Sequence, residues 1–167
     1  MKYILRPWRL KDIDHLVRYA DNVNIANNLT DKFPHPYTHD DGMAFIRYAN
    51  KHEPVSVFAI EVNGEACGGI GIHPQEDIWC KNAELGYWLA EHLWGQGIIT
   101  AAIKEMVTFG FETFDINRIY ARPFGSNKPS QRVLEKAGFQ LEARLKNTIF
   151  KNGVYEDEMI YGIRRDK

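Results

Sequence analysis

Two glycines, Gly95 and Gly97, stand between a predicted strand and a long predicted helix. Glycine adopts backbone angles that are closed to other residues and lets a ligand approach the main chain closely. The first N–H groups of a helix have no partner within the helix, and the helix dipole attracts negative charge to them. The segment from Gly95 to Thr100 is therefore predicted to bind the phosphates of a ligand. The alternative is a tight turn that only starts the helix.

Two common phosphate-binding loops do not fit this segment. A Walker A loop needs a lysine followed by serine or threonine, and no lysine lies between Gly95 and Thr100. A dinucleotide-binding loop needs a third glycine three residues after Gly97, where this chain has Thr100. A nucleotide-binding protein with an unusual glycine loop is one hypothesis that stays open.

A second segment, NKPSQRVLEKAGF (127–139), has the signals of a short helix. Asn127 is a preferred residue at a helix start, and Gly138 is preferred just after a helix end. Ser130 stands in the first turn, where its hydroxyl can protonate a leaving group or bond to the backbone near Asn127. The residues alone leave both uses open.

Together HLWGQGIITAAI (92–103) and the second segment resemble the cofactor-binding core of the GNAT superfamily of N-acetyltransferases. The similarity is to the branch of ribosomal-protein N-terminal (alanine/serine) acetyltransferases, whose second segment begins Asn-x-x-Ser and ends Glu-Lys-x-Gly-Phe. The family's loop is commonly Gln/Arg-x-x-Gly-x-Gly/Ala. Here His92 takes the Gln/Arg position, a departure that leaves the motif incomplete. The resemblance covers essentially the whole chain and is more specific for fold and cofactor than for the acceptor.

The resemblance implies that acetyl-CoA binds as the acetyl donor and that no metal takes part. Main-chain amides of the loop would hold the pyrophosphate, and main-chain groups at the end of the preceding strand would hold the thioester carbonyl. Side chains of the second segment would also contact the cofactor, although Lys128 and Arg132 could equally be charges that only face solvent. The implied cofactor contacts are Trp88, Leu89, Ala90, Gly95, Gln96, Gly97, Ile98, Ile99, Thr100, Asn127, Lys128, Ser130 and Arg132.

Two residues are candidates for proton transfer. The resemblance implies that the Ser130 hydroxyl donates to the coenzyme A sulfur. Glu84 lies on a predicted strand beside the cofactor and can accept the amine proton directly or through water, the alternative being an ion pair. Tyr37, Glu84 and Tyr87 are candidates for contact with the acceptor, although aromatic residues of this kind are commonly part of the core. Neither Cys67 nor Cys80 falls in a matched catalytic segment, which favours direct attack without an acetyl-enzyme.

Hydrophobic spacing predicts the elements that carry these residues. Asn63-Gly64 is the preferred type I′ pair and predicts a hairpin. The order of elements predicts an α+β fold with one βαβ step. The predicted strands are 3–9, 55–62, 65–72, 83–89, 118–122, 139–145 and 154–163, and the predicted helices are 11–20, a short one within 22–38, one starting at 38–41, 97–114 and 127–137.

The resemblance implies a GNAT-like single domain over residues 1–167. Its central sheet would be mixed, mostly antiparallel and twisted, with helices on both faces. The sheet would be splayed at the cofactor site, between strands 83–89 and 118–122.

Composition narrows the class of protein. Hydrophobic residues make up 44% of the 167 residues and charged residues 26%, which excludes a disordered chain. The net charge of -1 and the pI of about 6.6 do not favour nucleic-acid binding. No apolar run is long enough to span a bilayer, and Lys2, Arg6 and Arg9 interrupt any signal peptide. We expect a cytoplasmic protein, monomer or homodimer, with no nucleic-acid or membrane partner.

The leading hypothesis is an acetyl-CoA-dependent N-acetyltransferase that uses direct attack by a primary amine. A protein or peptide N-terminal α-amine is the expected acceptor, because its pKa of about 7.7–8.0 makes it easier to neutralise than lysine at about 10.4. One alternative is a small-molecule acceptor, such as a polyamine, an amino acid or an antibiotic. The other is a non-catalytic acyl-CoA-binding module.

Overall fold

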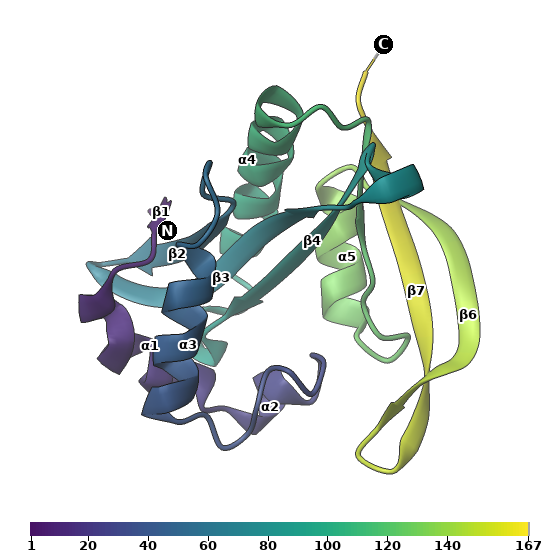
Figure 1. The fold of residues 1–167 in the computed structure, drawn as a ribbon. Helices are drawn as coiled ribbons and strands as arrows, with labels where there is room; N and C mark the ends of the chain where they lie inside the picture. The colour runs from purple at the N-terminus through teal and green to yellow at the C-terminus, as the bar shows by residue number, and fades with distance from the viewer. Residues whose placement is uncertain (167) are drawn as a thin grey trace. The chain divides into compact units, whose positions relative to one another are not determined.

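The computed structural model describes residues 1–166 (Figure 1). The chain forms two compact units: Met1–Gly71 with Tyr87–Ala102 make unit 1, and Ile72–Gly86 with the residues from Ile103 onwards make unit 2. The strands are β1 (Ile4–Pro7), β2 (Val57–Val62), β3 (Glu65–Pro74), β4 (Asn82–Leu89), β5 (Arg118–Ala121), β6 (Gln140–Lys151) and β7 (Val154–Arg164). The α-helices are α1 (Ile13–Ala20), α2 (Val23–Ala26), α3 (His39–Ala49), α4 (Ile98–Thr113) and α5 (Lys128–Lys136), with short 3-10 turns η1 (Leu10–Asp12), η2 (Asp77–Trp79) and η3 (Glu91–Leu93).

The strands hydrogen-bond in the order β1-β2-β3-β4-β5-β7-β6. The β4–β5 pair is parallel, whereas β1–β2, β2–β3, β5–β7 and β6–β7 are antiparallel. The predicted α+β fold with a mixed, mostly antiparallel sheet is therefore confirmed. The expectation of a single domain over 1–167 stays a prediction.

In unit 1, helices α1 and α3 contribute to one apolar core with Trp8, β2, the first part of β3 and Trp88 near the end of β4. Leu16 of α1 and Ile46 of α3 are fully buried in this core beside the indole of Trp8. The hairpin turn has the predicted form, since Asn63 and Gly64 have φ angles of 51° and 84°. These contacts fix the strand from which the predicted phosphate loop begins.

Unit 1 contains a buried ion pair between Arg6 and Asp12. The guanidinium of Arg6, on β1, donates to both carboxylate oxygens of Asp12 at 2.7 and 2.8 Å. Arg6 also contacts the carboxylate of Glu61 on β2. Both Arg6 and Asp12 are buried, so each charge depends on the other for compensation.

In unit 2, the parallel ladder between β4 and β5 is short. It pairs Asn82–Glu84 with Arg118–Tyr120, and β4 continues beyond it to Leu89. The ladder thus covers only the start of β4, one of the two strands between which the resemblance implied a splay. Part of α4 packs closely on this sheet, because a Cβ at Gly110 would lie 2.7 Å from the side chain of Ile72.

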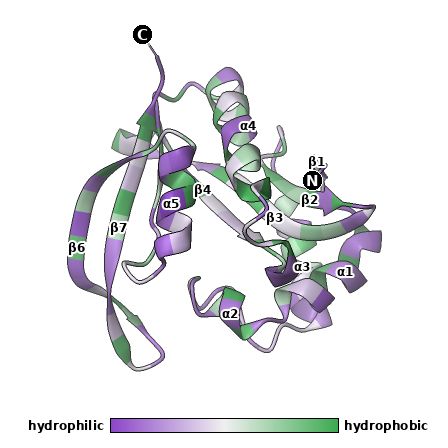
Figure 2. Cartoon of the chain, turned by 180° about the vertical axis from the view of Figure 1, so that it is seen from behind, coloured by the Kyte–Doolittle hydropathy of each residue, from purple (hydrophilic) through white to green (hydrophobic). Residues whose placement is uncertain are grey.

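Helix α5 is mostly hydrophilic, as its purple ribbon in Figure 2 shows. Two of its side chains, Gln131 and Leu134, are buried. The Gln131 amide donates to the carbonyls of Phe124 and Gly125, both at 3.1 Å. These bonds attach the start of α5 to the loop that leaves β5.

Strand β6 is longer than predicted, running to Lys151 instead of residue 145. Its second half is mostly exposed and polar, so it lacks the alternation that marks a strand in a sequence. The register with β7 shifts between Leu145 and Ile149, and Asn147 in this interval has a φ of 54°. Pairing with β7 therefore makes this part a strand.

Candidate active site

The predicted phosphate loop has the backbone that its glycines allow. Gly95 and Gly97 have φ angles of 72° and 79°, which other residues rarely adopt. Helix α4 begins at Ile98, and the amide of Ala101 donates to the Gly97 carbonyl at 3.1 Å. Helix geometry leaves the N–H groups of the first turn without an acceptor inside the helix.

The loop is also open to a ligand. Gly95, Gln96 and Gly97 are exposed, and a Cβ built on either glycine has no atom within 4 Å beyond the two adjacent residues. Within residues 95–100, Ile98 is the residue with a buried side chain, so only its main chain can face a ligand. An exposed loop followed by unpaired helix amides is suited to bind an anion.

Side chains from the loop itself hold it against the end of β4. The indole N–H of Trp94 donates to the Leu89 carbonyl at 2.7 Å, and the Gln96 amide donates to the His92 carbonyl at 3.0 Å. His92, the departure from the family motif, lies with its ring 5.3 Å from the ring of Tyr19 on α1. The loop is thus fixed by contacts that its glycine pattern did not predict.

The end of β4 offers fewer main-chain donors than the resemblance implied. Trp88, Leu89 and Ala90 are all buried. The Ala90 N–H donates to the Cys67 carbonyl at 2.8 Å, so it is already occupied. Contact of the thioester carbonyl with main-chain groups of Trp88 and Leu89 stays a prediction.

An aromatic cluster lies beside this strand in unit 1. The Phe33 ring is 5.2 Å from the Tyr37 ring and 5.7 Å from the Trp88 ring. Tyr37 is buried, and this burial raises the pKa of its hydroxyl to about 12. Its position is that of a core residue, the alternative that the sequence left open, and contact with an acceptor stays a prediction. Tyr87, on β4, is half-buried.

In unit 2, Glu84 forms an ion pair across β4 and β5. The Arg122 guanidinium donates to its two carboxylate oxygens at 2.9 and 3.2 Å and also reaches Glu158 at 3.3 Å. The hydrogen bond to Glu84 raises the pKa of Arg122. Burial, together with the Glu84 charge, raises the pKa of nearby Tyr120. Glu84 is therefore an ion-pair partner here, and its part in proton transfer stays a prediction.

The start of α5, also in unit 2, carries the remaining predicted residues. Asn127 is the N-cap, and its side-chain oxygen accepts from the Ser130 N–H at 3.3 Å. Ser130 is half-buried, whereas Lys128 and Arg132 are exposed. This exposure is compatible with both predictions for Lys128 and Arg132, which are contact with the cofactor and a charge that only faces solvent.

The predicted residues thus fall into two groups, one in each unit. Unit 1 holds the loop, the end of β4, Tyr37 and Tyr87, and unit 2 holds Glu84 and the start of α5. Sequence reasoning missed the side chains that fix these groups, above all Trp94 and Arg122. Their partners lie close only because of the fold, and no spacing in the sequence signals them.

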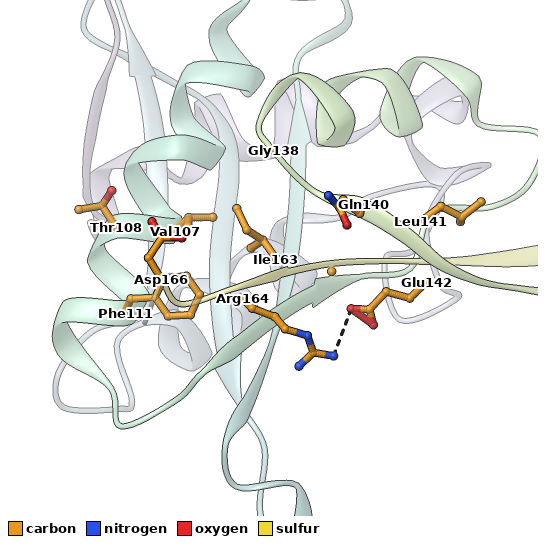
Figure 3. A pocket seen from close by; sticks show the side chains of 11 residues that line it. Val107, Thr108, Phe111, Gly138, Gln140, Leu141, Glu142, Ile163, Arg164 and Asp166 are labelled. Atoms are coloured by element: carbon orange, nitrogen blue, oxygen red, sulfur yellow. Dashed lines mark ion pairs between the residues drawn. The ribbon is translucent and has the colours of Figure 1, made fainter.

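Each unit has one notable surface hollow. The one in unit 2, of about 860 Å³, is bounded by α4, the start of β6 and the end of β7, and contains the Arg164–Glu142 ion pair drawn in Figure 3. None of the predicted site residues lines it. The hollow in unit 1, of about 430 Å³, lies beside the phosphate loop and is lined in part by Tyr19, His92 and Gln96.

Two other kinds of site, a metal site and a membrane span, concern residues 1–166 as a whole. No group of three or more His, Cys, Asp and Glu side chains is placed to hold a metal ion in this range. Within the same residues, no helix combines the length and apolar character that a membrane crossing requires.

Comparison with known proteins agrees with this geometry. Residues 2–140 match the family model of the acetyltransferase (GNAT) domain. YdaF of Bacillus subtilis, whose name assigns it provisionally to ribosomal N-acetylation, is 34% identical over 101 residues, which are 60% of this chain and 55% of that protein. The chain spans about half the length of the first curated relatives it matches.

Solved structures share the fold over nearly the full chain. The microcin C7 self-immunity acetyltransferase MccE, solved with acetyl-CoA and AMP, has a TM-score of 0.84 and 25% identity, covering 98% of this chain and 93% of that one. RimL, the ribosomal L7/L12 α-N-protein acetyltransferase solved with coenzyme A, has a TM-score of 0.86 and 23% identity, covering 99% and 96%. With the family model matching 139 of its 167 residues (2–140), the chain belongs to the GNAT acetyltransferase family.

Proposed function

We propose that this chain is an acetyl-CoA-dependent N-acetyltransferase that acts by direct attack of a primary amine, with a protein or peptide N-terminal α-amine as the acceptor. The observation that carries the proposal is the exposed loop Gly95–Gly97 with its positive φ angles at the start of α4, in a member of the GNAT family. An anion fits this loop, because no side-chain atom of the chain fills the space over either glycine.

The cofactor supplies an acetyl group as a thioester. On this proposal, amides of Gly95 to Thr100 hold its pyrophosphate, and the amides of Trp88 or Leu89 stabilise the oxyanion that forms when the amine adds to the carbonyl. Asn127, Lys128 and Arg132 are proposed to contact the rest of the cofactor.

Proton transfer completes the reaction. The amine nitrogen forms a bond to the carbonyl carbon, the carbon–sulfur bond breaks, and the thiolate leaves. Ser130 donates a proton to the sulfur and regains one from water, and Glu84 takes the proton lost by the amine, directly or through water, and releases it to solvent. Each Glu84 carboxylate oxygen accepts one bond from Arg122 and keeps a second lone pair that can accept from the amine or the water.

The choice of an α-amine is supported by its acidity and by relatives. Roughly a tenth or more of an α-amine is neutral at pH 7, whereas neutralising a lysine side chain costs roughly 4.6 kcal/mol. The names of YdaF and RimL point to ribosomal proteins, whereas MccE was solved with the small molecule AMP. The acceptor class therefore needs a direct test.

The test compares kcat/KM for acceptors under one set of conditions. Peptides with free or blocked N-termini, each with and without lysine, are assayed for thiol release from acetyl-CoA, together with spermidine. We expect peptides with a free N-terminus to have the highest kcat/KM, and the presence of lysine to change this value little. A tenfold advantage for spermidine, or for the blocked peptide with lysine, contradicts the α-amine assignment. Binding of acetyl-CoA without turnover of any acceptor would instead support the non-catalytic module.

A further inference from the structure

Glu91 binds two side chains of unit 1, which lie 69 and 67 residues before it in the chain. One carboxylate oxygen accepts from the Asn22 side chain at 2.7 Å, and the other accepts from the Asn24 side chain at 3.0 Å. Glu91 begins the turn η3, four residues before Gly95 of the phosphate loop. Its carboxylate therefore links the approach to this loop with the start of α2.

Asn22 connects the Glu91 contact to helix α2. While its amide nitrogen donates to Glu91, its side-chain oxygen caps α2 by accepting from the Asn24 N–H at 2.8 Å. The short helix and the bond to the loop thus depend on the same side chain. Holding Glu91 in place holds the first turn of α2 in place.

The neighbouring residue extends the link to the aromatic cluster. Asp21 accepts from the Tyr37 N–H at 2.9 Å and lies 3.3 Å from the His35 ring nitrogen. The Tyr37 ring contacts the Phe33 ring, which in turn contacts the Trp88 ring on β4. Residues 22–37 are therefore attached at both ends to the strand and loop of the proposed cofactor site.

A second contact strengthens the attachment of the loop. His92 packs on the ring of Tyr19, and the Tyr19 hydroxyl donates to the carboxylate of Glu65. The residue that departs from the family's Gln/Arg thus fixes η3 to α1. Two consecutive residues therefore connect η3, just before the phosphate loop, to neighbouring helices: His92 contacts α1 and Glu91 contacts the start of α2.

We propose that Glu91 is a positioning residue that couples binding of the cofactor at residues 95–100 to the ordering of residues 22–37, the segment that ends at Tyr37, a predicted contact of the acceptor. The proposal rests on the proposed function, because it takes coenzyme A as the ligand of the loop. A ligand that holds the loop also holds Glu91 and, through it, Asn22 and Asn24. Linkage requires the reverse as well, so an ordered acceptor segment favours cofactor binding.

Amide hydrogen exchange with coenzyme A as the probe tests this coupling. In the wild type, saturating coenzyme A is expected to slow exchange within residues 22–37 by about tenfold, a usual size for coupling between sites. In Glu91→Ala the slowing should fall below about twofold, and by reciprocity the Kd for coenzyme A measured by calorimetry should rise by no more than about tenfold. Glu112→Ala is the matched control, since Glu112 is an exposed glutamate on α4, and it should behave as the wild type.

Kinetics give a second readout that a general loss of structure would not mimic. Glu91→Ala should raise KM for the free-N-terminus peptide by about tenfold, with kcat nearly unchanged. Asn24→Ala should raise this KM by less, because the bond from Asn22 to Glu91 remains, and the double variant should be no worse than Glu91→Ala alone.

The outcomes separate this proposal from the proposed function. If the wild type does not bind coenzyme A, the proposed function is wrong and the coupling is wrong with it. If coenzyme A binds but protects residues 22–37 equally in Glu91→Ala, only the coupling is wrong. Additive effects of Glu91→Ala and Asn24→Ala would also overturn it.

Discussion

The side-chain oxygen of Asn127 accepts a hydrogen bond from the main-chain N–H of Ser130 at 3.3 Å. This bond caps α5 and satisfies one of the free amides at its start. Because it runs to the backbone of Ser130, the bond survives replacement of the side chain. The capping and the proposed catalytic use of Ser130 can therefore be separated by mutation.

Ser130→Ala is expected to lower kcat by about a hundredfold, as for loss of a general acid, and to leave coenzyme A affinity nearly unchanged. Some activity should persist, because a thiol with a pKa near 8.5 leaves in part without help. Steady-state kinetics and calorimetry measure the two effects. Ser126→Ala is the control, since the hydroxyl of Ser126 donates to Glu156. A rate within about twofold of wild type would remove Ser130 from catalysis.

Gly97→Val is expected to weaken coenzyme A binding by at least tenfold. Its side chain would occupy space that the chain leaves open, and the φ of 79° is costly for any residue with a Cβ, by about 1–2 kcal/mol. Gly153→Val isolates the second effect, because Gly153 has a φ of 76° and equally open surroundings. Calorimetry on both variants, with circular dichroism to check folding, is the measurement. Full affinity in folded Gly97→Val contradicts the loop assignment.

Glu84→Gln and Arg122→Gln distinguish a proton acceptor from an ion-pair partner. If Glu84 accepts the proton, Glu84→Gln lowers kcat by about a hundredfold. Arg122→Gln should then lower kcat less than threefold, because the carboxylate is still present. We expect this unequal result in kinetics across a range of pH. Equal losses in the two variants would show that only the Glu84–Arg122 contact matters.

Asp12→Asn is expected to destabilise the protein by about 3 kcal/mol at neutral pH, because it leaves the buried Arg6 charge without its main partner. Burial raises the pKa of the Asp12 carboxyl, but hydrogen bonds from Arg6 and Arg9 outweigh this and hold the pKa below its usual range. A lowered pKa stabilises the fold above the unfolded value, about 3.9, and this contribution is lost as pH falls through the folded value.

Urea unfolding measures the free energy of unfolding of wild type and Asp12→Asn. The difference between these two free energies should therefore become smaller below about pH 4. Asp14→Asn, an exposed aspartate on α1, serves as the control and should change stability by less than about 0.5 kcal/mol. A difference between wild type and Asp12→Asn that stays constant down to pH 2 would contradict the role of the ionised carboxylate.

Local signals were sufficient for most of the fold. The Asn63–Gly64 turn, the start of α4 after Gly97 and the Asn127 cap all depend on neighbours in the sequence, and the structure has each of them. The second half of β6 could not be predicted, since its strand conformation comes from pairing with β7.

The candidate site was predictable only in part for the same reason. The glycine loop is local, but the Arg122 contact of Glu84 joins residues 38 positions apart. Likewise, nothing near Ala90 in the sequence indicates that its amide is bonded to Cys67. Such pairs decide which groups are free for chemistry, and they arise from tertiary structure alone.

The position of β7 has a consequence for synthesis of the chain. This strand lies between β5 and β6, yet it is translated after both of them. Until β7 has left the ribosome, β5 and β6 each lack the neighbour with which they pair in the finished sheet. Unpaired strand edges invite association with other chains. Between translation of β5 and of β7, the nascent chain therefore carries two strand edges that are open to association with other chains.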